Sequence, residues 1–242
     1  MREALRPAVK LALRALSAAF APVTAAAGAV WRAGVRLRFI TDWTFPPTPD
    51  FFDHRFDIAF FERWRQPHFF ERGVYASEIC RGKRVLDLCS GDGAGAALFI
   101  APVAASVLGL DQHPGAVAHA RRRWQAIGNL RFEEMDIRKS ELPQRAFEVI
   151  LWDASIQYFT EQEMDSVLAR AREALAAGGI LHGSTIRGGS KKAQEQHRHE
   201  FASASELSEL LRRHFSHVLI WTREHADRSS LYFRCSELPV QR

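Results

Sequence analysis

Short apolar runs alternate with helical patterns along the middle of the chain. A strand buried on both faces gives a nearly continuous apolar run, and five such runs occur between Lys83 and Ser184. Strands and helices that alternate at this spacing form right-handed βαβ units and a largely parallel sheet. The five runs cover residues 84–88, 106–111, 129–135, 147–152 and 179–184.

Two helices between these runs are marked by end signals. Thr160 and Glu163 form a capping box before the second helix, and Gly178–Gly179 is predicted to end it. Pro114 stands in the first turn of the first helix, whose apolar positions are Val117, Ala120, Trp124 and Ile127.

A last helix and a pair of strands are predicted near the carboxyl end. Ser203 and Glu206 form a second capping box, and residues 217–222 and 230–235 form two runs joined by a charged turn. The expected fold is therefore α/β: a Rossmann-like, doubly wound, mostly parallel seven-stranded sheet with a final antiparallel strand, plus an N-terminal helical extension.

The charge of the chain is unevenly distributed. The 242 residues are 47% apolar and 25% charged, with a formal net charge of +5 and an isoelectric point near 9.4. Residues 1–41 hold seven basic residues and one acid, which leaves 26 basic and 27 acidic residues in 42–242. A nearly neutral body lacks the basic stripe of a nucleic-acid-binding protein, so we expect no nucleic-acid partner.

The basic N-terminal extension, residues 1–41, has a regular pattern. Arg2, Arg6, Lys10 and Arg14 recur every four residues and would form one basic stripe on a helix. Such a segment suits contact with an anionic membrane surface, which predicts a cytoplasmic protein peripheral to the inner face of a membrane. Three alternatives stay open: an organellar transit peptide, a signal peptide, which the segment resembles less well, and a helical extension that binds nothing.

Residues 42–82 are crowded with aromatic side chains and are expected to form a helical cap. His54 and Asp57 stand three residues apart on one face of a predicted helix, so His54 is a candidate base or part of a structural pair. Residues 83–242 then form the third predicted part of the chain. The three cysteines show no CxxC spacing, so we expect neither a disulfide framework nor a metal site.

The glycine-rich loop after the first run carries the candidate chemistry. Gly91, Gly93 and Ala96 match a dinucleotide-binding fingerprint, with Asp111 about twenty residues further on. Pyrophosphate, however, is an anion that requires bare backbone N–H groups, and Asp92 would place a carboxylate between the two glycines. An NAD(P)-dependent oxidoreductase is therefore the weaker alternative.

A cationic ligand without phosphate would fit these acids. The sequence resembles the class I S-adenosylmethionine-dependent methyltransferases, whose first motif runs acid-x-Gly-x-Gly-x-Gly after the first strand. One position departs from the pattern, because Cys89 stands where the first glycine of the motif usually is. The resemblance rests on five ordered segments, residues 85–93, 107–111, 134–137, 147–153 and 168–181.

The resemblance implies S-adenosylmethionine as the cofactor and assigns roles to single residues. Asp87 would lie at the methionine end, Asp111 would accept hydrogen bonds from the ribose hydroxyls, and Asp136 would accept one from the adenine amino group. Ile137 or Met135 would pack on the adenine ring, and Asp153 would lie beside the methyl group. The remaining expected cofactor-binding residues are Ser90, Gly91, Asp92, Gly93 and Gln112.

The acceptor side is less defined by the sequence. Asp153, Tyr158 and His54 are the candidate catalytic residues, since the loop after the fourth strand lies at the carboxyl edge of the sheet. The expected reaction is methyl transfer to an O or N atom of a small-molecule, sugar or lipid-linked acceptor. A non-catalytic scaffold that binds S-adenosylmethionine is the second alternative.

Overall fold

The computed structural model describes residues 18–20, 22–23, 26–30, 33–34, 67–143, 146–188, 197–225 and 228–241. The basic stripe formed by Arg2, Arg6, Lys10 and Arg14, as well as His54, lies outside these ranges. The chain divides into two units, Met1–Ile58 and Ala59–Arg242, and all strands and helices named below belong to the second unit. In the described ranges no helix is long and apolar enough to cross a membrane.

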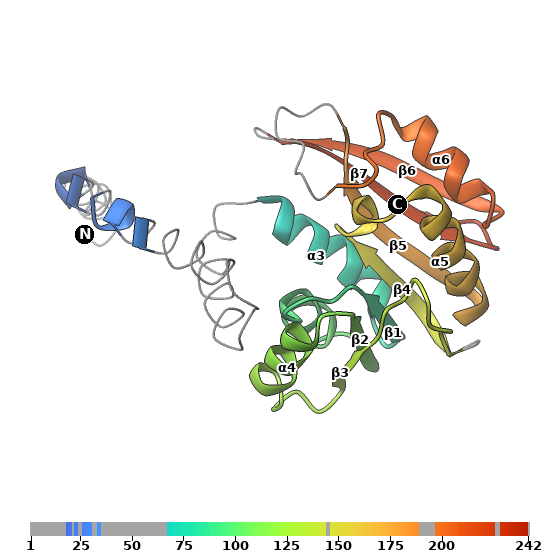
Figure 1. Cartoon of the computed structure of the whole chain (residues 1–242), viewed down its shortest axis with the longest axis horizontal. Coiled ribbons are helices and arrows are strands. Elements are labelled where there is room, and N and C mark those ends of the chain that lie inside the picture. Colours follow the sequence, from blue (N-terminus) through green and yellow to red (C-terminus); the bar gives the residue numbers. More distant parts are fainter. Residues whose placement is uncertain are drawn as a thin grey trace, which may run out of the picture. The chain divides into compact units, whose positions relative to one another are not determined.

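A seven-stranded sheet forms the second unit (Figure 1). Its strand order is β3-β2-β1-β4-β5-β7-β6; neighbours among the first five strands are parallel, and β7 is antiparallel to both β5 and β6. The predicted Rossmann-like sheet is thus confirmed. The strands are β1 (Arg84–Leu88), β2 (Ser106–Asp111), β3 (Leu130–Glu134), β4 (Phe147–Asp153), β5 (Leu175–Ile186), β6 (His217–Glu224) and β7 (Ser229–Ser236).

The helices begin at the predicted signals. Pro114 opens α4, Ser203 caps α6, and Thr160 and Glu163 make both hydrogen bonds of the capping box of α5. The helical elements are α3 (Pro67–Cys80), the π-helix η1 (Ala96–Ile100), α4 (Pro114–Arg123), the short 3-10 helix η2 (Ile156–Tyr158), α5 (Glu161–Ala174) and α6 (Ala204–Arg212).

The end of α5 differs from the prediction. The helix ends at Ala174, and β5 begins at once with Leu175, which pairs with Phe147. Gly178, with a φ of 73°, and Gly179 lie inside β5, where the register with β4 shifts. The two glycines therefore serve an irregular stretch of strand rather than a helix stop, because burial of Leu175 favours pairing over another helical turn.

Successive strand residues feed two separate cores. Val85 and Val149 pack with α3, η1 and α4 on one face of the sheet, whereas Leu86 and Ile150 pack with α5 and α6 on the other. This alternation follows from the period of two along a strand. With both faces covered, the open position for a ligand is the edge where the parallel strands end.

Candidate active site

The loop after β1 turns sharply through left-handed backbone conformations. Cys89, Gly91 and Gly93 have φ values of 60°, 56° and 73°. A left-handed conformation costs a non-glycine residue roughly 1–2 kcal/mol, which explains why the resembled motif has glycine at the position of Cys89. At Gly93 a Cβ atom would lie 2.4 Å from Cζ of Phe132, so only glycine fits there.

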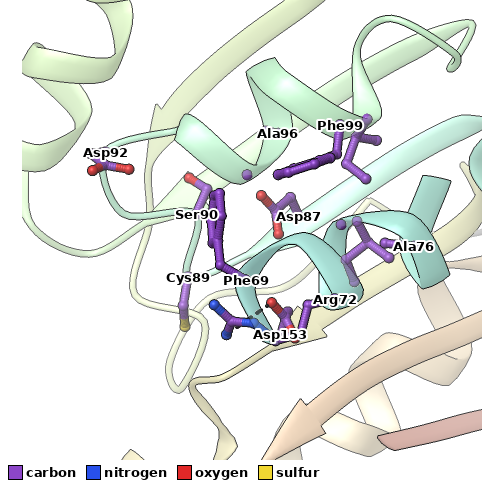
Figure 2. Close-up of a pocket in the computed structure, with 14 residues that line it drawn as sticks. Phe69, Arg72, Ala76, Asp87, Cys89, Ser90, Asp92, Ala96, Phe99 and Asp153 are labelled. Carbon is purple, nitrogen blue, oxygen red and sulfur yellow. Dashed lines mark ion pairs between the residues drawn. The ribbon is translucent and has the colours of Figure 1, made fainter. Parts of the chain in front are cut away.

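A pocket lies between this loop, α3 and the end of β4 (Figure 2). Four residues expected at the cofactor line it: Asp87, Ser90, Asp92 and Asp153. The facing wall comes from α3 and η1, with Phe69, Arg72, Gly73, Ala76, Ala96, Phe99 and Ile100. The pocket therefore combines carboxylates, one guanidinium and an aromatic wall.

Asp87 is buried close to two other carboxylates, those of Asp153 and Asp111. Burial, followed by the nearby charges of Asp153 and Asp111, raises the pKa of Asp87 to about 8. A cationic group beside Asp87 would relieve this repulsion and favour the carboxylate. The pocket thus selects for positive charge at that point.

Asp153 is held by two partners that we did not anticipate from the sequence. Nη1 of Arg72 lies 3.2 Å from Oδ2 of Asp153, and the Ser184 hydroxyl donates to Oδ1. Ser184 stands beside Asp153 in the register of β4 and β5. A usable signal for Arg72 was its helical spacing, three residues after Phe69 and four before Ala76, both of which line the same pocket.

Asp111, at the end of β2, has a fixed orientation. Its two carboxylate oxygens accept hydrogen bonds of 2.9 Å from the backbone N–H groups of Gly91 and His113. Each oxygen keeps a further lone pair, so Asp111 can still accept from two neighbouring hydroxyl groups. This geometry suits a ribose diol.

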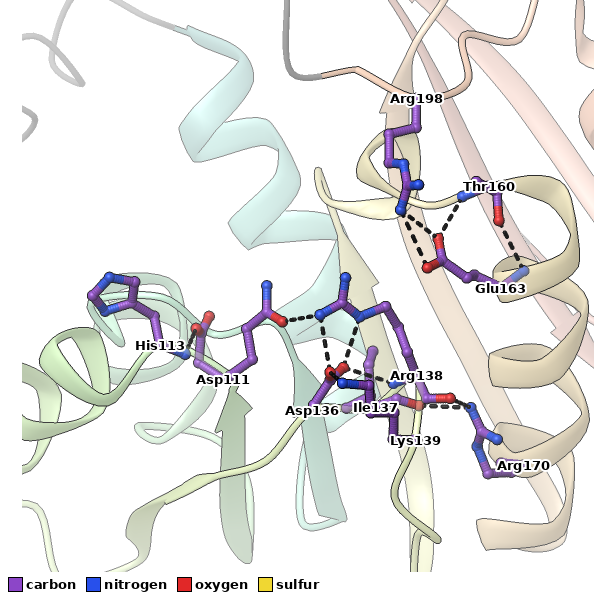
Figure 3. Close-up of polar contacts among 11 residues, drawn as sticks. Asp111, His113, Asp136, Ile137, Arg138, Lys139, Thr160, Glu163, Arg170 and Arg198 are labelled. Carbon is purple, nitrogen blue, oxygen red and sulfur yellow. Dashed lines mark hydrogen bonds and ion pairs between the residues drawn. The ribbon is translucent and has the colours of Figure 1, made fainter.

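Asp136 and Gln112 are joined by an arginine (Figure 3). Arg138 donates from Nε to Oδ1 of Asp136 at 2.8 Å and from Nη2 to Oδ2 at 2.9 Å, and Nη2 also donates to Oε1 of Gln112. The paired guanidinium lowers the pKa of Asp136 to about 2. The carboxylate of Asp136 therefore stays ionised near neutral pH, where it can accept hydrogen bonds but not donate them.

The match to known families agrees with this site. Residues 85–179 match a family described as a methyltransferase domain. Residues 85–179 thus form a methyltransferase domain. A stretch of 99 residues, 40% of this chain, is 35% identical to a trans-aconitate 2-methyltransferase of Methylobacterium nodulans. The match spans about a third of that relative, 36% of its length.

Solved structures share the fold of the methyltransferase domain at low sequence identity. A DhpI complex with S-adenosylhomocysteine is 21% identical, with a TM-score of 0.58 over 84% of this chain and 93% of that chain. A phosphoethanolamine N-methyltransferase of Haemonchus contortus, solved with phosphomonomethylethanolamine and S-adenosylhomocysteine, is 14% identical, with a TM-score of 0.59 over 71% of this chain and 53% of that chain.

The other expected residues that the structure describes are not lining residues of the pocket: Gly91, Gly93, Asp111, Gln112, Asp136, Ile137 and Tyr158. Ile137 is 3% exposed and belongs to the core that α5 covers. Tyr158, in η2, is 36% exposed, and its ring centroid lies 5.2 Å from that of His197. Within the described ranges Tyr158 is not a lining residue of the pocket, and it faces the loop that follows β5.

The polar side chains at this edge of the sheet have the chemical types that S-adenosylmethionine requires, and Asp87 and Arg72 among them line the pocket. Asp87 and Arg72 present opposite charges to an amino-acid group, Asp111 presents two acceptors to a ribose, and Asp136 presents an acceptor to an amino group of a base. Among the residues placed in the structure, no cluster of His, Cys, Asp and Glu could hold a metal ion.

Proposed function

We propose that this chain transfers a methyl group from S-adenosylmethionine to an O or N atom of a small-molecule acceptor. One observation carries the proposal: Asp87 and Arg72 line one pocket at the carboxyl edge of the sheet, next to the left-handed glycine loop. A carboxylate and a guanidinium facing the same space complement the ammonium and carboxylate of an amino-acid group.

The cofactor supplies a methyl group on a sulfonium, which is a good leaving group. The task left to the protein is to position the reactants and exclude water. The aromatic wall of Phe69 and Phe99 shields the pocket. Asp153, steadied by Arg72 and Ser184, lies at the end of β4, where it can orient the acceptor or take its proton.

The proposed acceptor is a small molecule. Residues 42–242 carry nearly balanced charge, which speaks against nucleic acid. The similar proteins named above act, by their names, on trans-aconitate and phosphoethanolamine, both small anionic molecules. A sugar or lipid-linked acceptor would enter from the same edge of the sheet.

Calorimetry with two ligands tests the cofactor site. Wild-type protein should bind S-adenosylhomocysteine, and Arg72→Met should weaken that binding by about 10–100-fold, since a hydrogen bond to a charged group contributes about 1.5–3 kcal/mol. Binding of 5′-methylthioadenosine, which lacks the amino-acid group, should not change.

The control is Arg131→Met, because Arg131 is an exposed arginine on β3 outside the pocket. If the wild type shows no heat of binding with S-adenosylhomocysteine, the proposal is wrong. Stabilisation by NADH instead would restore the oxidoreductase alternative. Binding without turnover on any acceptor of a broad panel would favour the non-catalytic scaffold.

A further inference from the structure

Arg72 is the one cation among the residues that the structure places around the pocket, where it meets three acids. Its guanidinium lies beside Asp153, with Nη1 3.2 Å from Oδ2 (Figure 2). Asp87 and Asp92 line the same pocket. A ligand that brings a carboxylate into this pocket therefore finds no second cationic side chain among these residues, and it must approach the guanidinium that Asp153 already contacts.

The ion pair leaves part of the guanidinium unused. A guanidinium carries five N–H donors, and its strong pairs with carboxylates are bidentate. Nη1 of Arg72 contacts Asp153, whereas Nε is buried and has no hydrogen-bond partner in the described part of the chain. A buried donor without a partner costs free energy, so a second carboxylate that reaches Nε would gain a hydrogen bond that Asp153 does not make.

Each partner of the ion pair has a second support. The Ser184 hydroxyl donates to Oδ1 of Asp153, and Ser184 stands beside Asp153 in the register of β4 and β5. The guanidinium carbon of Arg72 lies 5.9 Å from the centroid of the Phe69 ring, which attracts the cation. Phe69 also lines the pocket. Arg72 can therefore turn from Asp153 to a ligand without leaving the pocket, and Ser184 would still hold the Asp153 carboxylate.

We infer that Asp153 competes with the carboxylate of the cofactor for Arg72, and that binding of the cofactor releases Oδ2 of Asp153 to the acceptor. This inference rests on the proposed function. An acceptor that offers an O–H or N–H group to Oδ2 finds that oxygen free only after the cofactor is bound, so the cofactor binds first and the acceptor second. Arg72 is then a positioning residue for the acceptor, because it acts through Asp153.

Two ligands that differ in one carboxylate test the competition. The decarboxylated form of S-adenosylhomocysteine keeps the ammonium group, so the affinity for S-adenosylhomocysteine relative to this form reports on the carboxylate alone. Calorimetry on the full chain should show that this relative affinity rises about 3–10-fold in Asp153→Asn, because the competing side chain has lost its charge. In the Arg72→Met background the same substitution should leave the relative affinity unchanged, since no guanidinium is there to be released.

The matched control is Glu148→Gln. Glu148 also belongs to β4 and contacts Nζ of Lys83 at the same 3.2 Å, but it is not a lining residue of the pocket, so the relative affinity should stay at the wild-type value.

The outcomes separate the inference from the proposed function. An unchanged or lower relative affinity in Asp153→Asn, or an equal rise in the Arg72→Met background, would overturn the inference. If S-adenosylhomocysteine binds neither the wild type nor Asp153→Asn, the proposed function itself is wrong. If Asp153→Asn does not fold, Asp153→Ser, which also lacks the charge, should raise the relative affinity in the same way.

Discussion

Three carboxylates converge where β1, β2 and β4 end, and Asp87 bears the electrostatic consequence. Its pKa of about 8 in the folded chain, against about 3.8 for the ordinary side chain, means that the fold keeps a proton on Asp87 near neutral pH. Asp111 accepts hydrogen bonds from backbone N–H groups, and Asp153 contacts Arg72 and Ser184. A cation bound beside Asp87 would favour its ionised form.

The pH dependence of stability follows from this residue. Between pH 4 and pH 8 the folded chain binds a proton at Asp87 that the unfolded chain does not, so this group makes stability fall as pH rises through that range. We expect Asp87→Asn, which stays neutral, to raise Tm more at pH 8 than at pH 5 in thermal unfolding without ligand. A gain of the same size at both pH values would contradict the assigned shift.

At the scale of elements, strands were easier to predict than the side chains that meet between them. Runs such as Val85–Leu88 are buried on both faces, so hydrophobicity alone marks them, and the acids at their ends share one edge by topology. The contacts of Arg72 and Ser184 with Asp153 were not predicted, because they depend on how α3 and β5 lie against β4. The prediction that Gly178 ends α5 was wrong, because a glycine suits an irregular position in a strand as well as the end of a helix.

The packing of α3 against η1 permits a prediction about an element. A Cβ on Gly73 would lie 2.3–2.5 Å from ring atoms of Phe99, whose ring already contacts Phe69 and Phe70. Gly73→Ala gains helix propensity of about 1 kcal/mol, but the overpacking should cost more, for a net loss of about 1–3 kcal/mol and of roughly 2–12 °C in Tm.

The affinity for S-adenosylhomocysteine should fall with the stability of Gly73→Ala, because a displaced α3 moves Arg72 away from the pocket. Gly128→Ala is the matched control, since a Cβ there meets nothing within 4 Å. A Gly73→Ala protein as stable as Gly128→Ala would show that α3 and η1 can separate at no cost.

For the whole molecule, net charge is a poor guide to function until it is divided along the sequence. Residues 1–41 carry a net charge of +6 and the rest a net charge of −1, and three acids of the second part, Asp87, Asp92 and Asp153, line the pocket. We propose that residues 1–41 bind an anionic membrane surface.

Vesicle flotation tests this proposal on the intact chain. At low salt, the wild type should float with vesicles that contain phosphatidylglycerol and remain in the bottom fraction with vesicles of pure phosphatidylcholine. The reason is that electrostatic attraction to the surface needs anionic lipid and is screened by salt. Replacing Arg2, Arg6, Lys10 and Arg14 with glutamine should weaken binding by roughly 100–1,000-fold, at about 1 kcal/mol per charge. The affinity for S-adenosylhomocysteine should stay the same in this variant, since the site is built from other residues. A wild type that never floats would leave the transit peptide, the signal peptide and the helical extension that binds nothing as the remaining explanations of the basic stripe.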